Sequence, residues 1–324
     1  MRTTTLGRSG LDVSRIAFGT WQIGGDWGSF DTDAAVQAIQ LAREQGVNFF
    51  DTAQAYGFGK AEQILGKALA SDLRHRRDEV VIATKGGINP GGDPSRDAGR
   101  ANLRDGVEQS LRALGVDHID LYQVHWPDTR TPPEETAGAL QELVDEGKIR
   151  HVGVSNYTTA QLTAFDRTRA AETLQPPYHL FRRAIEVDPL PYAREHDIGV
   201  LAYSPLGSGL LTGALGPDST FAPDDWRSQS SAFQGENLRR NLAVVDRLAE
   251  FASDKNASVS QLAIAWVLAQ PGVHVAIAGA RQPAHVETSL AADELDLTQD
   301  DLAEIDRITA DAVQVDGASP EGVA

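Results

Sequence analysis

Two residues of opposite charge end short apolar runs in this sequence. Asp51 closes the run NFFD, and Lys85 closes the run VVIATK. Burying one isolated charge costs several kcal/mol, but two opposite charges a few ångströms apart largely offset that cost. We therefore expect Asp51 and Lys85 to form a buried ion pair. In the alternative interpretation, each side chain reaches water separately at the end of its run.

Tyr56 and His125 would add proton chemistry to this pair. Tyr56 lies five residues after Asp51, and the ordinary pKa of a tyrosine, about 10, is too high for easy proton transfer at neutral pH. A neighbouring ammonium lowers the pKa of a phenol, so Lys85 beside Tyr56 would produce a usable general acid. His125 ends another apolar run, where a neutral imidazole could donate to a carbonyl oxygen. Taken alone, His125 is more typical of a core histidine with satisfied hydrogen bonds.

The hydrophobic pattern predicts the elements that position these residues. Short apolar or β-branched runs, each a predicted strand, alternate with longer amphipathic segments, each a predicted helix. Eight such units predict an α/β protein with a (β/α)8 TIM barrel, and an open doubly wound sheet is the alternative. The predicted strands are 15–21, 48–53, 80–85, 119–125, 149–156, 173–175, 199–205 and 273–279, and the predicted helices include 33–44, 61–69, 102–114, 134–145 and 160–170.

The strands of such a barrel all end at one face, where the active sites of this fold lie. Side chains that follow different strands would therefore meet at one pocket. Besides the residues above, several runs end in groups that can form hydrogen bonds: Thr20, Ser155, Asn156, Gln175, Tyr203 and Ser204. Capping of the next helix is the alternative role for Ser155 and Asn156.

Three segments do not fit the repeating pattern. Residues 3–13 contain the runs TTTL and LDVS around a glycine turn, which predicts a hairpin able to close the lower end of the barrel. Residues 207–235 form a long polar loop after the seventh strand, and loops of this length are typically functional or mobile. We expect one domain over residues 1–311 and a disordered tail over residues 312–324.

Composition excludes several classes of protein. The 324 residues include 29 Lys and Arg against 46 Asp and Glu, a net charge of −17, so nucleic acids and anionic membranes are poor partners. The absence of cysteine excludes disulfides, thiolate zinc sites and cysteine nucleophiles, and no metal site is expected. No run suits a signal peptide or a membrane span, which predicts a cytoplasmic protein, and we expect a monomer.

Seven segments, in order and each at a predicted strand end, resemble the aldo-keto reductase superfamily. The resemblance extends from Leu6 to about Ala291 and implies a TIM barrel. It is strongest to the bacterial branch near the inositol-operon and general-stress reductases, with potassium-channel β subunits as relatives. The segments are FFDTAQAYGFGKAEQILGKAL (49–69), VIATKGG (81–87), DLYQVHWPD (120–128), VGVSNY (152–157), QPPYHLFRR (175–183), LAYSPLGSGLLTG (201–213) and IAGARQPAHVETSL (277–290).

This resemblance implies a catalytic tetrad of Asp51, Tyr56, Lys85 and His125. Tyr56 would donate a proton to the oxygen of a substrate carbonyl, while NAD(P)H delivers hydride to its carbon. Lys85, anchored by Asp51, would lower the pKa of Tyr56. His125 would orient the carbonyl group.

The resemblance also implies a dinucleotide site that lacks the Gly-x-Gly-x-x-Gly fingerprint, and no such motif follows a predicted strand and opens a helix. The implied contacts lie at the strand ends and in the loops that follow. They are Ser155, Asn156 and Gln175 on the nicotinamide carboxamide, Tyr203 stacked on its ring, Ser204, Leu206, Gly207 and Gly209 at the pyrophosphate, Gly279, Arg281, His285 and Ser289 at the adenosine end, and Thr20 and Trp21 as further contacts.

Arg281 favours NADP as the cofactor, because a guanidinium group binds a ribose 2′-phosphate with two hydrogen bonds. A solvated loop charge is the alternative role for Arg281. His285 and Ser289 depart from the Arg or Gln and the Asn that relatives commonly carry. NAD is therefore the alternative cofactor.

The expected substrate is a small carbonyl compound in an aromatic pocket. Trp21, Tyr56 and Trp126 would flank the carbonyl, and Trp226 of the long loop would close over it, with packing inside the loop as its alternative role. The expected function is NADPH-dependent reduction of aldehydes and ketones to alcohols, or the reverse oxidation of a polyol or sugar. An NADP-binding regulatory or sensor module with little turnover is the alternative, and a non-redox barrel with Lys85 as a Schiff-base amine is a third.

Overall fold

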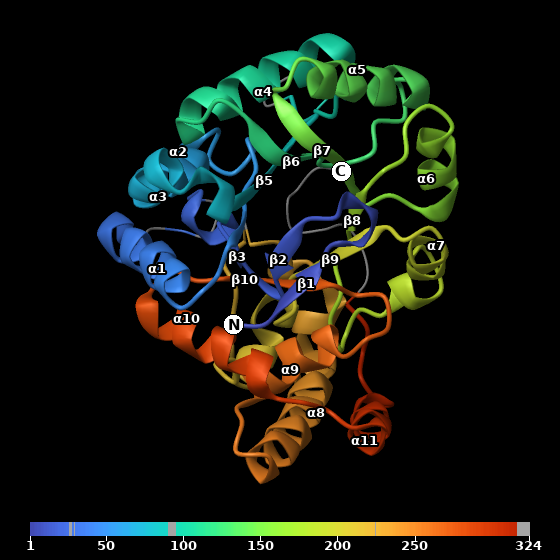
Figure 1. Ribbon diagram of the computed structural model, residues 1–324. Coiled ribbons are helices and arrows are strands. Elements are labelled where there is room, and N and C mark those ends of the chain that lie inside the picture. The colour runs from blue at the N-terminus through green and yellow to red at the C-terminus, as the bar shows by residue number, and fades with distance from the viewer. Residues whose placement is uncertain (26–27, 29, 90–94, 224, 316–324) are drawn as a thin grey trace.

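A closed barrel of eight parallel strands forms the centre of the protein (Figure 1). The computed structural model describes residues 1–25, 28, 30–89, 95–223 and 225–315. Strands pair in the order β10-β3-β4-β5-β6-β7-β8-β9, and β9 pairs with β10 to close the ring. The predicted TIM barrel is thus confirmed, and the open sheet is excluded. The strands are β3 (Ile16–Gly19), β4 (Phe49–Asp51), β5 (Val81–Gly86), β6 (Ile119–Val124), β7 (Ile149–Ser155), β8 (Thr173–Gln175), β9 (Gly199–Tyr203) and β10 (Val275–Gly279).

The register of the strands brings their polar ends together. One face of each strand lies inside the barrel and the other faces helices, so the sequence is apolar on both faces, and every residue of β5 and β6 is buried. Lys85 is paired with Gln123 across β5 and β6, and Ser155 is paired with Gln175 across β7 and β8. Because the strands are parallel, these residues reach the same end of the barrel.

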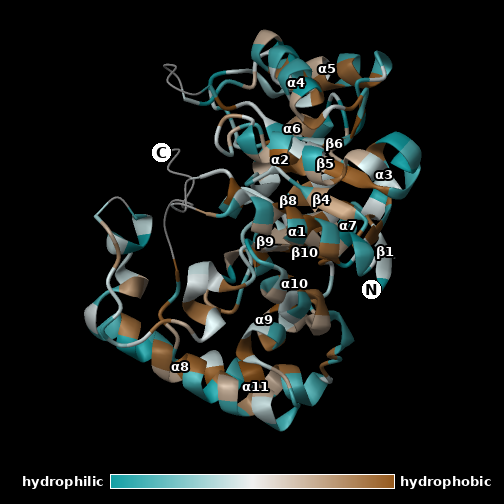
Figure 2. Ribbon diagram, turned by 90° about the vertical axis from the view of Figure 1, so that its left-hand side faces the viewer, coloured by the Kyte–Doolittle hydropathy of each residue, from teal (hydrophilic) through white to brown (hydrophobic). Residues whose placement is uncertain are grey.

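Helices surround the barrel (Figure 1), and Figure 2 shows hydrophobic residues along the strands and polar residues over much of the outer helix surface. Their ends follow local signals: the Asp31 carboxylate caps the start of α1, and Gly115, at φ 71°, ends α4. Within the described ranges, none of the helices is both long and apolar enough to cross a lipid bilayer. They are α1 (Thr32–Glu44), α2 (Lys60–Ala68), α3 (Ala70–His75), α4 (Arg100–Leu114), α5 (Pro133–Asp145), α6 (Thr159–Asp166), α7 (Leu190–Glu195), α8 (Gly235–Asp254), α9 (Val259–Leu268), α10 (Pro283–Leu290) and α11 (Gln299–Thr309).

The helix predicted over 160–170 is shorter than expected. α6 ends at Asp166, whose carboxylate accepts a hydrogen bond from Ala171 N at 2.8 Å. This side chain satisfies the backbone just after the helix, so the chain can leave the helix and turn toward β8. At the other end, Thr158 and Gln161 cap the helix reciprocally, which fixes its start.

The predicted N-terminal hairpin is present and lies across one end of the barrel (Figure 1). β1 (Thr3–Thr5) pairs antiparallel with β2 (Asp12–Ser14). Leu6 and Val13 are fully buried and belong to the same apolar cluster as residues inside the barrel, such as Phe49 and Leu121. The hairpin therefore closes the end of the barrel at which the strands begin. Gly7, at φ 47°, permits this approach, because a Cβ there would lie 2.4 Å from Gly199 N.

The long loop after β9 and the C-terminal segment both pack on the body of the protein. In the loop, the rings of Phe221 and Trp226 each meet Phe233 edge-on. The predicted disordered tail begins at residue 312, but residues 312–315 are held in place. Val315 is buried and its N–H donates to Phe181 O, and Val313 N donates to Asn241 Oδ1. Residues 312–315 thus contact the body of the protein, residues 316–324 lie outside the described residues, and disorder over 312–324 stays a prediction.

Candidate active site

Lys85 lies at the centre of a hydrogen-bonded cluster inside the barrel. Its Nζ is 2.7 Å from Asp51 Oδ1, 2.9 Å from the Thr52 carbonyl oxygen and 3.3 Å from Tyr56 Oη. Only 1% of Lys85 and 3% of Asp51 is exposed. Each of the three N–H bonds of the ammonium thus has an acceptor, and the carboxylate balances its charge. The buried ion pair expected from the sequence is present, and two separately hydrated side chains are excluded.

Backbone hydrogen bonds hold this cluster together. Thr52 N donates to Ala83 O at 2.9 Å, and Gln54 N donates to Lys85 O at 3.1 Å. The chain that leaves β4 therefore runs alongside β5 before it turns at Tyr56. This path brings the phenol beside the ammonium, although the two residues come from different units of the barrel.

Two rings enclose the phenol of Tyr56. Trp21 stacks on it with ring centroids 6.3 Å apart, and His125 meets it edge-on with centroids 5.6 Å apart. His125 is 2% exposed, and its backbone N–H donates to Gly86 O at 2.9 Å, which fixes the start of the loop after β6 against β5. The four residues predicted to be catalytic therefore lie in one cluster.

Ser155, Asn156 and Gln175 form a second hydrogen-bonded group. Ser155 Oγ donates to Gln175 O at 2.8 Å, and Asn156 Nδ2 donates to Ser155 Oγ at 2.9 Å. Asn156 Nδ2 also donates to His125 O at 3.1 Å. Gln175 Nε2 donates to Asp51 Oδ2 at 2.8 Å, which connects this group to the Lys85 cluster.

Asn156 has a backbone conformation that serves this group. Its φ of 63° lies in the left-handed region, which asparagine tolerates better than most residues. Its Oδ1 accepts a hydrogen bond from Tyr203 Oη at 3.0 Å. The alternative role for Ser155 and Asn156 as a helix cap is wrong, because Thr158 caps α6.

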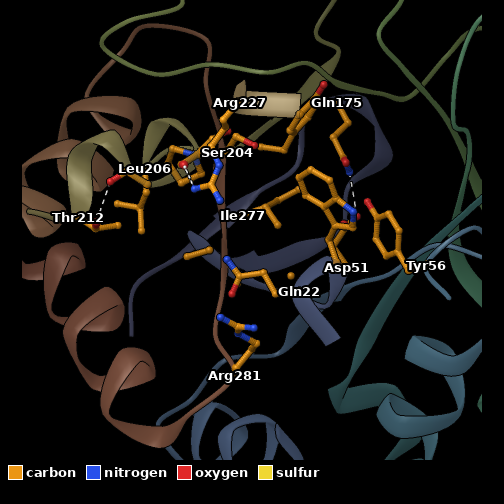
Figure 3. A pocket seen from close by; sticks show the side chains of 18 residues that line it. Gln22, Asp51, Tyr56, Gln175, Ser204, Leu206, Thr212, Arg227, Ile277 and Arg281 are labelled. Carbon is orange, nitrogen blue, oxygen red and sulfur yellow. Dashed lines mark hydrogen bonds between the residues drawn. The ribbon is translucent and has the colours of Figure 1, made fainter. Parts of the chain in front are cut away.

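A cavity of about 320 Å³ opens beside Tyr56 (Figure 3). Figure 3 shows Asp51 and Tyr56 at one end of this cavity and Leu206 and Thr212 at the opposite end. Most of its wall comes from the strand ends and from the loop after β9. The lining residues are Gly19, Trp21, Gln22, Asp51, Tyr56, Gln175, Tyr203, Ser204, Pro205, Leu206, Ser208, Gly209, Thr212, Arg227, Ile277, Ala278, Gly279 and Arg281.

The loop after β9 supplies hydroxyl groups and one guanidinium to the cavity. Ser204 and Ser208 adopt left-handed conformations, with φ of 56° and 54°, so the chain makes tight turns there. Arg227 Nη1 donates to Ser208 O at 3.2 Å, and Arg227 also pairs with Asp225 at 2.6 Å. Hydrogen bonding from Arg227 lowers the pKa of Asp225 below its ordinary value. Asp225 thus remains an anion that holds Arg227 in the wall of the cavity.

The side of the cavity near β10 carries a second guanidinium. Gln22 and Arg281 lie next to each other there (Figure 3), and Gly279 lines the wall between β10 and β3. A Cβ at Gly279 would approach Gly19 O to 3.2 Å, so the absence of a side chain keeps this part of the cavity open.

Several residues predicted to contact a cofactor or substrate do not line the cavity. Thr20 is fully buried, and its hydroxyl has no hydrogen-bond partner among the described residues. Ser289 borders a separate, much smaller cavity. The other predicted residues outside the lining are Ser155, Asn156, Gly207, His285, Trp126 and Trp226, together with Lys85 and His125, which lie beside Tyr56.

Neither Trp126 nor Trp226 is among the residues that line the cavity. The guanidinium of Arg96 lies 4.8 Å above the Trp126 ring. Trp226 packs against Phe233, so its side chain belongs to the apolar cluster of the long loop. Its neighbour Arg227 lines the cavity instead. The alternative role of Trp226 in loop packing thus fits the structure.

Sequence reasoning missed five lining residues with suitable chemistry: Gln22, Ser208, Thr212, Arg227 and Ile277. Gln22 directly follows the predicted contact Trp21, and Ser208 lies between the predicted contacts Gly207 and Gly209. Their position next to predicted contacts was a local signal that these two residues could line the cavity. Nothing in the long loop distinguishes Arg227 from a solvated charge until the loop is folded.

The lining fits a phosphate-containing dinucleotide. Two guanidinium groups, from Arg227 and Arg281, provide charge in a protein that is otherwise strongly acidic. The hydroxyl groups of Ser204, Ser208 and Thr212 provide hydrogen bonds along the same wall. Positive charge combined with hydroxyl groups is the chemistry that phosphate oxygens require.

The fold and the site define an enzyme class, and the chain belongs to the aldo/keto reductase family, whose model matches residues 15–310. Such proteins transfer hydride between carbonyl and alcohol groups of small molecules and use nicotinamide cofactors. The chain is therefore an oxidoreductase of this kind, and the superfamily expected from the sequence is confirmed.

Among its relatives, the chain is 40% identical to aldo-keto reductase YhdN of Bacillus subtilis (strain 168), over 100% of this chain and 98% of that protein. It is 35% identical to a probable voltage-gated potassium channel subunit beta of Arabidopsis thaliana, over 90% of this chain and 91% of that one. It is 33% identical to the NADH-specific methylglyoxal reductase of Escherichia coli (strain K12), over 97% of this chain and 100% of that protein. A solved structure, the glycerol dehydrogenase from Gluconobacter oxydans, superposes with a TM-score of 0.87 at 41% identity, over 98% of this chain and 97% of that one.

Proposed function

We propose that this enzyme reduces aldehydes and ketones to alcohols with NADPH, with Tyr56 as the general acid, and that it catalyses the reverse oxidation of a polyol or sugar when the alcohol is in excess. The observation that carries this proposal is the position of the Tyr56 hydroxyl, 3.3 Å from the buried ammonium of Lys85 and at the edge of the cavity. A general acid must lie where it can reach the substrate and where its conjugate base is stabilised.

Lys85 stabilises the phenolate that remains after Tyr56 gives its proton to the carbonyl oxygen. Asp51, 2.7 Å away, keeps the ammonium in place and balances its charge. All three N–H bonds of Lys85 have acceptors, which disfavours the third interpretation, a free amine that forms a Schiff base. In the oxidation direction, the phenolate accepts the proton of the alcohol.

The remaining groups orient the reactants. When bound, the reduced nicotinamide supplies the hydride that the carbonyl carbon receives. Trp21 and Tyr56 line the cavity with aromatic surface that excludes water from the reacting carbonyl, and the imidazole of His125 lies against the phenol to orient the carbonyl oxygen. Such positioning converts an encounter in solution into a reaction of fixed geometry.

The proposed preference for NADPH over NADH depends on Arg281. Its guanidinium, next to Gln22, would bind a ribose 2′-phosphate. Because one relative is named as an NADH-specific methylglyoxal reductase, the two cofactors are compared directly. The protein is titrated with NADPH and with NADH, and cofactor fluorescence reports binding. The Kd for NADPH should be lower than the Kd for NADH by about tenfold or more. Equal affinities would contradict the preference.

The catalytic proposal is tested by substituting the acid. The wild-type protein, mixed with NADPH and 4-nitrobenzaldehyde or methylglyoxal, should consume NADPH, which is followed by its absorbance. Tyr56→Phe should lower kcat by about 10³-fold or more and leave the Kd for NADPH unchanged, because general acid catalysis contributes about 10²- to 10⁴-fold. Tyr192→Phe is the matched control, since the Tyr192 hydroxyl bonds Asp166 outside the cavity. Persistent turnover in Tyr56→Phe would remove the proposed acid.

A regulatory module that binds NADP without turning it over is the alternative, favoured by the similarity to the probable channel subunit of Arabidopsis thaliana. The complete cluster of Asp51, Tyr56, Lys85 and His125 argues against it, because binding alone needs no proton-transfer set. Tight NADPH binding with negligible turnover across a broad panel of aldehydes would establish the alternative.

A further inference from the structure

A second buried carboxyl group lies outside the barrel, behind the Lys85 cluster. Glu62, on α2, is fully buried, and its Oε1 accepts a hydrogen bond from Thr84 Oγ1 at 2.7 Å. Burial raises the pKa of Glu62 above its ordinary value, and the hydrogen bond from Thr84 opposes that shift. Glutamate is rarely fully buried without a specific partner, so its position here calls for a reason.

Thr84 connects Glu62 to the ammonium of the active site. Thr84 directly precedes Lys85 in β5, and successive side chains of a strand point to opposite faces. Lys85 therefore faces the interior of the barrel, while the hydroxyl of Thr84 faces α2. A hydrogen bond from Thr84 to α2 thus fixes the segment of β5 that carries Lys85.

Glu62 is also connected to Tyr56, the proposed general acid, through the backbone. α2 begins at Lys60, and Ala61 N donates to Tyr56 O at 3.2 Å, so the first turn of the helix is continuous with the turn that carries Tyr56. Glu62 is the next residue of that helical turn. Its side chain therefore holds the Tyr56 segment against the Lys85 segment.

The turn between Tyr56 and α2 needs such an anchor. Gly57, Phe58 and Gly59 have φ of 60°, 51° and 90°, three consecutive residues in the left-handed region. Phe58, a bulky residue in that conformation, carries strain of about 1–3 kcal/mol. Phe58 is also 72% exposed, so its own side chain contributes little packing to hold the turn.

We propose that Glu62 is a positioning residue for the reaction: through its hydrogen bond to Thr84 it keeps the Tyr56 hydroxyl and the Lys85 ammonium within proton-transfer range. This inference rests on the proposed function of Tyr56. An apolar residue at position 62 would fill the same space at lower desolvation cost, but it would not fix β5 relative to α2. A displacement of about 1 Å at a reacting group lowers rates by about 10²-fold, so a modest loosening of this contact is measurable in kcat.

Four single variants and one double variant test the hydrogen bond itself. Glu62→Leu and Thr84→Val remove one partner each with little change in shape, and each should lower kcat about tenfold. KM for the aldehyde and the Kd for NADPH should stay within about twofold of wild type. Glu62→Gln keeps an acceptor and Thr84→Ser keeps a donor, so both should restore kcat to within about twofold of wild type. The two partners share one contact, so their effects should not add. The Glu62→Leu/Thr84→Val double variant should have about the same kcat as the less active of the two single variants.

Asp120→Asn is the matched control for stability. Asp120 is also a buried carboxylate that accepts a hydrogen bond from β5, from Ile82 N at 2.9 Å, but at the opposite end of the barrel. This variant should lower the Tm and leave kcat unchanged.

The outcomes separate this inference from the proposed function. If wild-type protein turns over and the Glu62→Leu and Thr84→Val proteins keep wild-type kcat, Glu62 has a purely structural role and the inference is wrong. If Glu62→Leu fails to fold, Thr84→Val gives the same test with a smaller perturbation. Absence of turnover in the wild type would instead contradict the proposed function.

Discussion

The two ends of the barrel use buried charge in different ways. At the end where strands begin, the Asp120 carboxylate accepts hydrogen bonds from Ile82 N at 2.9 Å and from Arg77 Nη2 at 2.7 Å. These bonds connect β6 to β5 and to the segment before β5. At the end where strands finish, the Lys85–Asp51 pair instead lies beside a cavity and a phenol.

Left-handed residues and buried hydroxyls without a hydrogen-bond partner also occur at the cavity end. Asn156, Ser204 and Ser208 hold left-handed conformations around the cavity end. The buried hydroxyls of Thr20 and Thr52, also at that end, have no hydrogen-bond partner among the residues described. Groups of this kind reduce stability, and proteins retain them mainly at functional sites. The comparison teaches that one end of the barrel supports the fold while the other is arranged for chemistry.

The strongest way to break this division is to remove the charge at the cavity end. Lys85→Met should lower kcat by about 10³-fold, because the phenolate of Tyr56 loses its stabilising charge. It should also lower the free energy of unfolding by about 3–5 kcal/mol, because Asp51 is left buried without its partner. Steady-state kinetics and urea unfolding measure the two effects. The exposed Lys67→Met variant is the control, and kcat within tenfold of wild type in Lys85→Met would contradict the assigned role.

The closed end is tested at Leu6, a buried apolar residue of the N-terminal hairpin. Leu6→Ala should lower the free energy of unfolding by about 2–5 kcal/mol, since it leaves a cavity beneath the barrel interior. Its kcat per folded molecule should equal that of wild type. Leu11→Ala, at a half-buried position of the same hairpin, should cost less. A large fall in kcat for Leu6→Ala would show that the two ends are not independent.

A smaller effect, the dependence of stability on pH, is expected from a buried histidine near the loop after β9. Burial lowers the pKa of His179, which lies beside Gly207 in the loop after β9, to about 3, and Phe181 N donates to its Nδ1. The unfolded-state pKa is about 6.5, so the neutral imidazole contributes stability above pH 6.5 that is lost by up to about 1.4 kcal/mol per unit as the pH falls toward 3.

Replacing this imidazole should make the free energy of unfolding depend less on pH below pH 6.5. His179→Asn keeps an acceptor for Phe181 N and removes the titration, so the difference in unfolding free energy between wild type and variant should shrink between pH 6.5 and pH 4.5. Urea unfolding at several pH values measures it. His274 at the closed end, whose pKa burial also lowers, is the comparison variant. If the difference in unfolding free energy between wild type and His179→Asn did not change with pH, the lowered pKa of His179 would be contradicted.

The sequence was informative where a residue's position depends on strand periodicity. The ends of apolar runs predicted that Asp51, Lys85 and His125 would share one face, because a parallel barrel leaves no other arrangement. Periodicity does not extend into loops, so Trp226 was expected at the cavity where its neighbour Arg227 lies. Glu62 was missed because it sits inside an otherwise ordinary helical pattern, and only packing shows that it faces β5.

The pairing of β10 with β3 has a consequence for synthesis of the protein. Ile16 and Ala276, which lie side by side, are separated by most of the chain, so the ring stays open until its last strand has been made. Long-range pairing of this kind forms slowly compared with local contacts. Trp21 follows the first barrel strand and Arg281 follows the last, and both line the cavity. The cavity can therefore be complete only after both of these segments have been made.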